Sequence, residues 1–136
     1  QLIVQSDADL PRGDGELILI VEDQELLREV MSQSLEMWQY RTLSADNGLD
    51  ALALLEKLQE PVALIFCDVI MPRMGGIALL QNLAQRNRDI PVVLMSGHPL
   101  DVDMTLLEDL GVIAVLKKPI QFEHLVHTVA TILGKY

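Results

Sequence analysis

The sequence predicts an α/β fold in which a doubly wound, five-stranded parallel sheet carries helices on both of its faces. Short apolar runs alternate five times with longer stretches whose apolar residues recur every three or four positions. Most of the short runs are continuously apolar, which is typical of strands covered on both sides. Strands and helices that alternate at this spacing form parallel sheets through right-handed crossovers.

Each of the first three units is a strand followed by a turn and a helix. A strand at 17–21 leads through an acid pair into a helix with the apolar stripe Leu27, Val30, Met31, Leu35 and Trp38. A weaker strand at 41–44 precedes a helix striped by Ala51, Leu52, Leu55 and Leu58. The strand at 62–67 ends in Asp68 and a turn rich in Pro and Gly, before a helix striped by Ile77, Leu80, Leu83 and Ala84.

Two further units complete the chain. A strand at 91–95 ends in Ser96 and precedes a shorter helix at about 101–110. The fifth strand, 112–116, ends in Lys117, Lys118 and Pro119, and the last helix is striped by Leu125, Val126, Val129, Ile132 and Leu133.

The length of 136 residues corresponds to about one domain. Residues 1–16 combine Ser, Asp, Pro and Gly without a sustained period, so we expect a linker or the tail of a preceding domain there. The folded domain is then expected at 17–136. Because the sequence starts at Gln1 and not at Met, we expect it to be a piece of a longer protein.

Composition excludes several classes of partner. Twenty Asp and Glu against ten Lys and Arg give a formal net charge of -10, which repels nucleic acid and anionic lipid. We therefore expect no direct nucleic-acid binding and no membrane contact. No apolar run approaches the roughly 20 residues of a membrane span, and the lone Cys67 cannot form an internal disulfide. We expect a cytoplasmic protein in which Cys67 is a buried core thiol.

Polar residues follow four of the strands: Glu22 with Asp23, Asp68, Ser96 and Lys118. In the strand order 2-1-3-4-5 the first and third strands are neighbours at the switch point, so their acids converge at the carboxyl edge of the sheet. Three carboxylates this close repel one another, and a divalent cation would relieve the repulsion. Oxygen ligands favour Mg²⁺ over Zn²⁺.

A carboxylate beside Mg²⁺ and an ammonium group can attack phosphorus. Asp68 would form an acyl phosphate, while Mg²⁺ and Lys118 neutralise the phosphoryl oxygens. Ser96 would add a hydrogen bond from its hydroxyl group. Each of these residue types therefore fits one step of a phosphoryl transfer.

Residues 17–136 resemble the receiver domain of two-component response regulators, which has a flavodoxin-like fold. That family carries an acid pair after the first strand, an aspartate before a Met-Pro-x-Met-x-Gly turn, Ser or Thr after the fourth strand, and Lys-Pro after the fifth. The matching residues here are Glu22 and Asp23, Asp68 with Met71, Pro72, Met74 and Gly76, Ser96, and Lys118 with Pro119.

The resemblance implies a role for each residue. Asp68 would be the phosphoacceptor, and Asp23 and Asp68 would ligate Mg²⁺ together with the backbone carbonyl of Ile70. Glu22 would act mostly through water, and Lys118 would pair with the phosphoryl group. The resemblance also implies a cis peptide bond between Lys118 and Pro119, a histidine kinase domain as phosphodonor, and a histidine phosphotransfer protein as a further partner.

One position departs from the family pattern, and the roles of two others stay open. Val115 stands three residues before the lysine, where the family often has Tyr or Phe, so we expect a switch in which Ser96 moves inward without an aromatic flip. His98 and Ile70 occupy positions that line the water path in the family. Each of them either tunes dephosphorylation or serves only as a loop residue.

Other functions share parts of this pattern. An FMN-binding flavodoxin needs a phosphate-cradling loop where Glu22 and Asp23 would repel phosphate, so this function is excluded. A haloacid dehalogenase phosphatase needs an aspartate at the position of Ile70, so we do not expect turnover of outside substrates. His124 and His127 indicate a solvated helix face and not a zinc site. A pseudo-receiver that binds partners without phosphorylation stays open.

The parent protein is the second open choice. The linker composition, the start without Met and the absence of an output domain before Tyr136 favour a hybrid sensor histidine kinase. The alternative is a stand-alone or DNA-binding response regulator.

Overall fold

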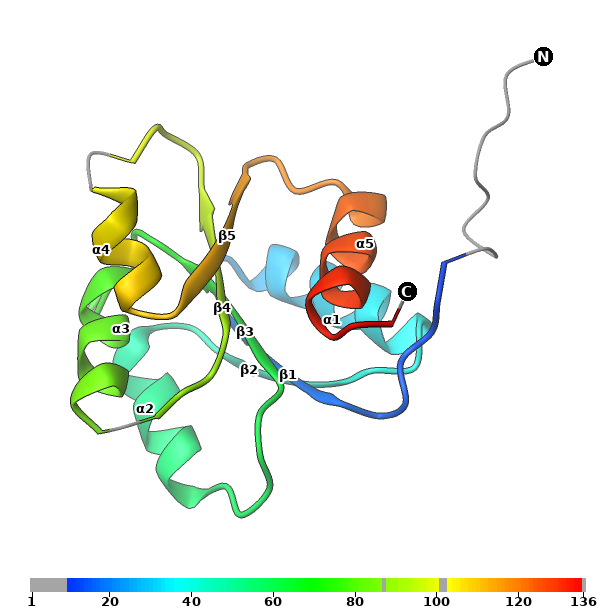
Figure 1. Cartoon of the computed structure of the whole chain (residues 1–136), viewed down its shortest axis with the longest axis horizontal. Coiled ribbons are helices and arrows are strands. Elements are labelled where there is room, and N and C mark those ends of the chain that lie inside the picture. Colours follow the sequence, from blue (N-terminus) through cyan, green and yellow to red (C-terminus); the bar gives the residue numbers. More distant parts are fainter. Residues whose placement is uncertain (1–9, 87, 101–102, 136) are drawn as a thin grey trace.

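The structure, a computed structural model, describes residues 10–86, 88–100 and 103–135. Five strands form one parallel sheet in the order β2-β1-β3-β4-β5, which confirms the predicted fold class and strand order (Figure 1). The strands are β1 (Leu17–Val21), β2 (Arg41–Ala45), β3 (Leu64–Asp68), β4 (Val92–Ser96) and β5 (Val112–Lys117). The helices are α1 (Glu25–Met37), α2 (Gly48–Lys57), α3 (Gly76–Gln85), α4 (Met104–Asp109) and α5 (Phe122–Ile132).

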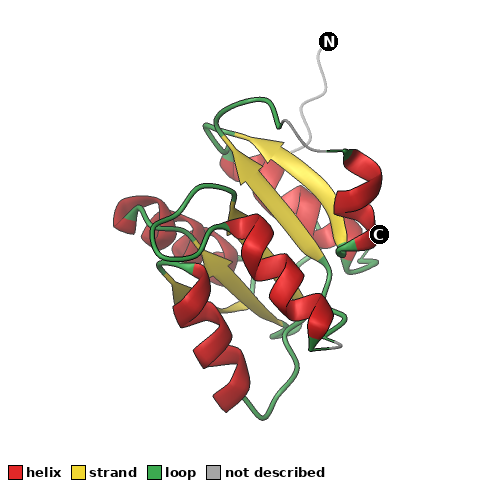
Figure 2. Cartoon of the chain, turned by 90° about the vertical axis from the view of Figure 1, so that its left-hand side faces the viewer, coloured by secondary structure: helices red, strands yellow, loops and turns green. Residues whose placement is uncertain are grey.

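The helices form a layer on each side of the sheet. Helices α1 and α5 cover one face, and α2, α3 and α4 cover the other (Figures 1 and 2). Because side chains alternate along a strand, Leu19 and Val21 of β1 join the core under α2, α3 and α4. Ile18 and Ile20 join the core under α1 and α5. Every residue of β1 is therefore buried, as a strand between two helix layers requires.

Helix stripes differ from the prediction at single positions. Val30 is 48% exposed, because it lies one position before the buried Met31 and thus about 100° around the helix. Ser34 is buried in its place, and its hydroxyl donates to the carbonyl oxygen of Val30 at 2.7 Å. In α3, Ala84 is exposed and Leu79 is buried for the same geometric reason.

Element bounds shift by one or a few residues. Strand β3 begins at Leu64, so Val62 and Ala63 precede it, and Asp68 is its last residue. Helix α4 begins at Met104, where the side chain of Asp103 accepts a hydrogen bond from the backbone N–H of Thr105. The predicted start of that helix at 101–102 lies outside the described residues.

The described part of the predicted linker contacts the domain. The backbone N–H of Gly13 donates to the carbonyl oxygen of Trp38 at 2.7 Å, and the guanidinium of Arg12 lies 4.7 Å from the centre of the Trp38 ring. Lys135, near the other end of the chain, forms ion pairs with Asp14 and Glu16. Residues 1–9 of the predicted linker, and Tyr136, lie outside the described residues.

Among the described residues, no helix combines the length and the apolar character that crossing a membrane requires.

Candidate functional site

The carboxyl ends of β1 and β3 bring three acids together. The two strands are paired in parallel, with Val21 opposite Cys67, so Glu22 and Asp23 follow β1 beside Asp68 at the end of β3. Each of the three acids offers a carboxylate oxygen, and these oxygens lie within 4.8 Å of one another. The predicted convergence at the switch point is therefore present in the fold.

The three carboxylates have different environments. Glu22 is fully buried and Asp68 is 7% exposed, whereas Asp23 lies at the surface. One carboxylate oxygen of Glu22 accepts a hydrogen bond from the backbone N–H of Gln24 at 3.0 Å. Burial raises the pKa of Glu22, and the side-chain interaction with Asp23 and the negative charge of Asp68 add to the rise. The hydrogen bonds from Lys118 and from the backbone of Gln24 oppose it. Negative charge is thus crowded at this edge of the sheet.

Lys118 bridges two of the acids. Its Nζ donates to Oε1 of Glu22 at 2.7 Å and to Oδ2 of Asp68 at 3.0 Å. Burial alone would lower the pKa of Lys118, but the bonds to both carboxylates outweigh burial and raise it. The Lys118–Pro119 peptide bond is cis, as the resemblance implied. The preceding Lys117 is exposed, and no contact of its side chain with the acids is recorded in the described residues.

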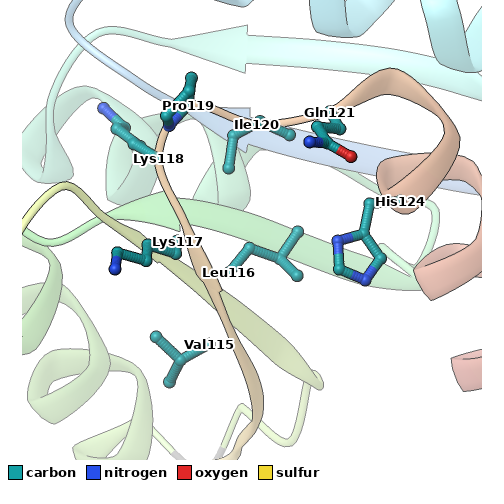
Figure 3. A pocket seen from close by; sticks show the side chains of 8 residues that line it. All are labelled: Val115, Leu116, Lys117, Lys118, Pro119, Ile120, Gln121 and His124. Carbon is teal, nitrogen blue, oxygen red and sulfur yellow. The ribbon is translucent and has the colours of Figure 1, made fainter.

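A groove of about 520 Å³ runs beside Lys118, lined by Val115, Leu116, Lys117, Lys118, Pro119, Ile120, Gln121 and His124. Figure 3 shows the amino group of Lys118 directed away from His124, and Leu116 on the opposite side of the strand from Val115 and Lys117. His124 and His127 belong to no group of metal-binding side chains in the part of the chain that the structure describes. Both histidines are exposed on α5, as the sequence predicted for a solvated helix face.

Ser96 ends β4 and is 8% exposed. Its hydroxyl donates to the carbonyl oxygen of His98 and accepts from the backbone N–H of His98 at 3.2 Å. Both bonds engage the hydroxyl with its own loop. Val115 is half-buried and lines, with Ser96, Met104 and four other residues, a hollow of about 400 Å³. This position therefore carries no ring that could move with Ser96.

The turn after Asp68 depends on a glycine. A Cβ atom added to Gly76 would lie 2.5 Å from the carbonyl oxygen of Asp68, a distance that real Cβ atoms do not adopt. Gly76 thus allows α3 to begin directly against the strand end that carries Asp68. Ile70, between the two, has a side chain that is 71% exposed.

The thiol of Cys67 is fully buried, as predicted. Burial, with the nearby charges of Asp68 and Glu22, raises its pKa far above the ordinary value. The burial confirms the predicted core position of this thiol.

Sequence reasoning missed Arg28. This residue lies in α1, and its Nη1 donates to the backbone carbonyl oxygen of Glu22 at 2.8 Å. The available signal was a cation five and six positions after the two acids, from where a long side chain can reach back to the start of the helix.

Comparison with known proteins decides the family. The response regulator receiver domain family matches residues 18–130. The chain belongs to this family. This receiver domain is 35% identical over 106 residues to the two-component response regulator-like protein PRR73 of Oryza sativa subsp. indica. The alignment covers 76% of the chain and 14% of the relative.

Two further alignments cover a larger share of the similar protein. The receiver domain is 33% identical over 118 residues to the transcriptional regulatory protein CpxR homolog of Haemophilus influenzae, covering 87% of the chain and 50% of the relative. It superposes with a TM-score of 0.80 on a CheY-like response regulator receiver domain protein from Methanospirillum hungatei, at 23% identity, covering 90% and 96% of the two chains. The latter shows the shared fold. The chain spans half or less of the length of these two curated relatives.

Proposed function

We propose that this receiver domain accepts a phosphoryl group from a histidine kinase on Asp68, in a reaction that requires Mg²⁺. The observation that carries the proposal is the 3.0 Å hydrogen bond from Nζ of Lys118 to Oδ2 of Asp68. An ammonium held against one carboxylate of an acidic group is suited to meet the negative charge of an incoming phosphoryl group. Membership of the receiver family supports the same assignment.

The donor set fits Mg²⁺. Glu22, Asp23 and Asp68 offer carboxylate oxygens close together, and Mg²⁺ prefers oxygen ligands. The raised pKa of Glu22 reflects burial and crowded negative charge, which a cation would relieve. Asp23 and Asp68 would hold the ion with the carbonyl of Ile70, and Glu22 would act mostly through water. When bound, Mg²⁺ supplies positive charge to the phosphoryl oxygens.

Asp68, Lys118 and Ser96 each have a separate role in the phosphoryl transfer. A carboxylate oxygen of Asp68 attacks phosphorus, and the bond from phosphorus to the imidazole nitrogen of the kinase histidine breaks, leaving its electron pair on the imidazole. Lys118 balances the charge of the resulting acyl phosphate. Ser96 exchanges its bond to the His98 carbonyl for one to a phosphoryl oxygen. The loop after β4 would then change its conformation on phosphorylation. This change would involve no aromatic ring, because position 115 is Val115.

Intact mass after treatment with acetyl phosphate and Mg²⁺ tests the phosphoacceptor. The wild type should gain one phosphoryl group and Asp68→Asn none. Asp109→Asn removes an exposed acid at the end of α4 and should be labelled like the wild type. Equal labelling of wild type and Asp68→Asn would overturn the assignment. A wild type that neither gains label nor binds Mg²⁺ would support the alternative, a pseudo-receiver interaction module.

Calorimetric titration tests the metal site. Asp23→Ala should abolish Mg²⁺ binding, because the ion depends on the convergent carboxylates for its charge. Retention of the wild-type affinity in this variant would sink the proposed ligand set.

The parent protein is a separate proposal. We predict a hybrid sensor histidine kinase, in which Asp68 receives the phosphoryl group from the kinase histidine and passes it to a histidine phosphotransfer protein. Incubating the phosphorylated domain with the kinase core and with the phosphotransfer protein, and following the label, tests both transfers. A helix-turn-helix domain in the same open reading frame would establish a DNA-binding regulator instead.

A further inference from the structure

Arg28 holds the peptide group that joins the two acids after β1. Its Nη1 lies 2.8 Å from the carbonyl oxygen of Glu22, the oxygen of the peptide between Glu22 and Asp23. The side chain reaches back six positions to make this bond. The backbone of Arg28 is itself held, because its N–H donates to the carbonyl oxygen of Gln24 at 3.0 Å at the start of α1.

Glu22 is fixed at each of its other polar groups. Its backbone N–H donates to the carbonyl oxygen of Ala45 at 3.0 Å. Its carboxylate accepts from Lys118 at 2.7 Å and from the N–H of Gln24 at 3.0 Å. The carbonyl oxygen is the remaining polar group, and Arg28 binds it. The bond to Arg28 therefore completes the set that orients Glu22.

Asp23 differs from Glu22 because its side chain lies at the surface. No close packing fixes an exposed carboxylate, so the orientation of its backbone decides where it can reach. That orientation depends on the peptide plane between Glu22 and Asp23, which is the plane that Arg28 binds. A change of ψ at Glu22 that is not compensated by φ at Asp23 would move the Asp23 carboxylate away from those of Glu22 and Asp68.

We propose that Arg28 is a positioning residue for the cation site. It holds the Glu22–Asp23 peptide so that the carboxylate of Asp23 stays grouped with those of Glu22 and Asp68. This inference rests on the proposed Mg²⁺-dependent function and adds a residue that is not itself a metal ligand.

The charge of Arg28 and a positioning role for Arg28 predict opposite changes in Mg²⁺ affinity when the residue is replaced. A guanidinium near a cation site repels the ion, so if charge alone mattered, removal of Arg28 would tighten Mg²⁺ binding. If Arg28 positions Asp23, its removal loosens a ligand and weakens binding. Groups that orient metal ligands typically contribute roughly 10–100-fold in affinity. The sign of the change therefore separates the two roles.

The experiment measures the Kd of Mg²⁺ by calorimetry for wild type and three variants. Arg28→Met keeps the length of the side chain but removes the donor and the charge, and should raise the Kd by about 10-fold or more. Arg28→Lys keeps a donor and the charge and should restore part of the affinity. The matched control is Arg88→Met, because Arg88 also donates to a backbone carbonyl, that of Leu55 at 2.9 Å, and should leave the Kd unchanged.

A folded Arg28→Met with unchanged or tighter Mg²⁺ binding would overturn the inference. If Arg28→Met does not fold, Arg28→Gln replaces it, with the same expected rise in Kd and the same contrary result. Failure of the wild type to bind Mg²⁺ would refute the proposed function itself. Wild-type binding with an unaffected Arg28 variant refutes only the role of Arg28.

Discussion

The ammonium group of Lys118 lies 2.7 Å from a carboxylate oxygen of Glu22, although 96 positions separate the two residues. The pair joins the end of β5 to the end of β1, and Asp68 at the end of β3 lies 3.0 Å from the same nitrogen. One cation thus serves two buried carboxylates, one of them fully buried. The role of this contact in phosphorylation and in stability can be tested by substitution.

Replacement of Lys118 should impair both phosphorylation and folding. Lys118→Met removes the donor that faces Asp68 and should slow labelling by acetyl phosphate by about 10²-fold or more, as loss of one charge-stabilising donor does elsewhere. It also leaves Glu22 buried without its cation, which should lower the free energy of unfolding by about 1–3 kcal/mol. Lys117→Met, at the exposed neighbour, should change neither. Equal labelling rates for the two variants would contradict the assigned role of Lys118.

Gly76 should not tolerate a side chain. In Gly76→Ala the new Cβ would meet the carbonyl oxygen of Asp68 at 2.5 Å, so the turn must shift at a cost of about 1–3 kcal/mol in unfolding free energy. Gly97 provides the control, because a Cβ there meets nothing within 4 Å. Urea denaturation should show a lower midpoint for Gly76→Ala alone. Equal midpoints for both variants would show that the turn relaxes freely.

Cys67 should be protected from alkylation in the folded state. The side chain is fully buried, and burial raises its pKa, so little reactive thiolate is accessible. At pH 8, iodoacetamide should modify the native domain at least about 100-fold more slowly than the urea-unfolded chain, because reaction requires opening of the core. Comparable rates in the two states would exclude a stable core around β3.

Glu16 should contribute a stabilisation that depends on pH. Burial alone would raise the pKa of Glu16, but hydrogen bonds from Lys135 and the backbone outweigh it and hold this pKa below its ordinary value of 4.5. A lowered folded-state pKa means that the stabilisation is complete above the unfolded-state value and is lost as the pH falls through the folded-state value. Glu16→Gln should therefore melt about 1–4 °C below the wild type at pH 7.

The same variant has a clear contrary outcome. The difference in melting temperature between wild type and Glu16→Gln should shrink as the pH falls through the folded-state pKa, because Glu16 is then protonated. It should also shrink in high salt, which screens the pair with Lys135. A difference that is constant from pH 7 to pH 3 would assign the effect of Glu16 to packing instead of charge.

The fold class, the strand order and the candidate site residues could all be predicted from the amino-acid sequence. Strands β3 and β4 are buried on both faces and must be apolar, so the polar residues that end these runs, Asp68 and Ser96, can be identified from the sequence. Lys118 likewise follows the apolar run of the edge strand β5. The parallel order then places the ends of β1 and β3 side by side, which is why the acids could be grouped before their distances were known.

The contacts that hold those groups became known only from the folded structure. The sequence does not indicate that Glu22 is buried while its neighbour Asp23 is exposed, because both residues directly follow β1. The path of the backbone after β1 turns one side chain inward and the other to the surface. It does not reveal that Ser96 binds its own loop through His98 or that Arg28 reaches the carbonyl of Glu22. These contacts depend on rotamers and loop paths that are set by packing across the whole domain. A local pattern of apolar and polar residues therefore does not predict them.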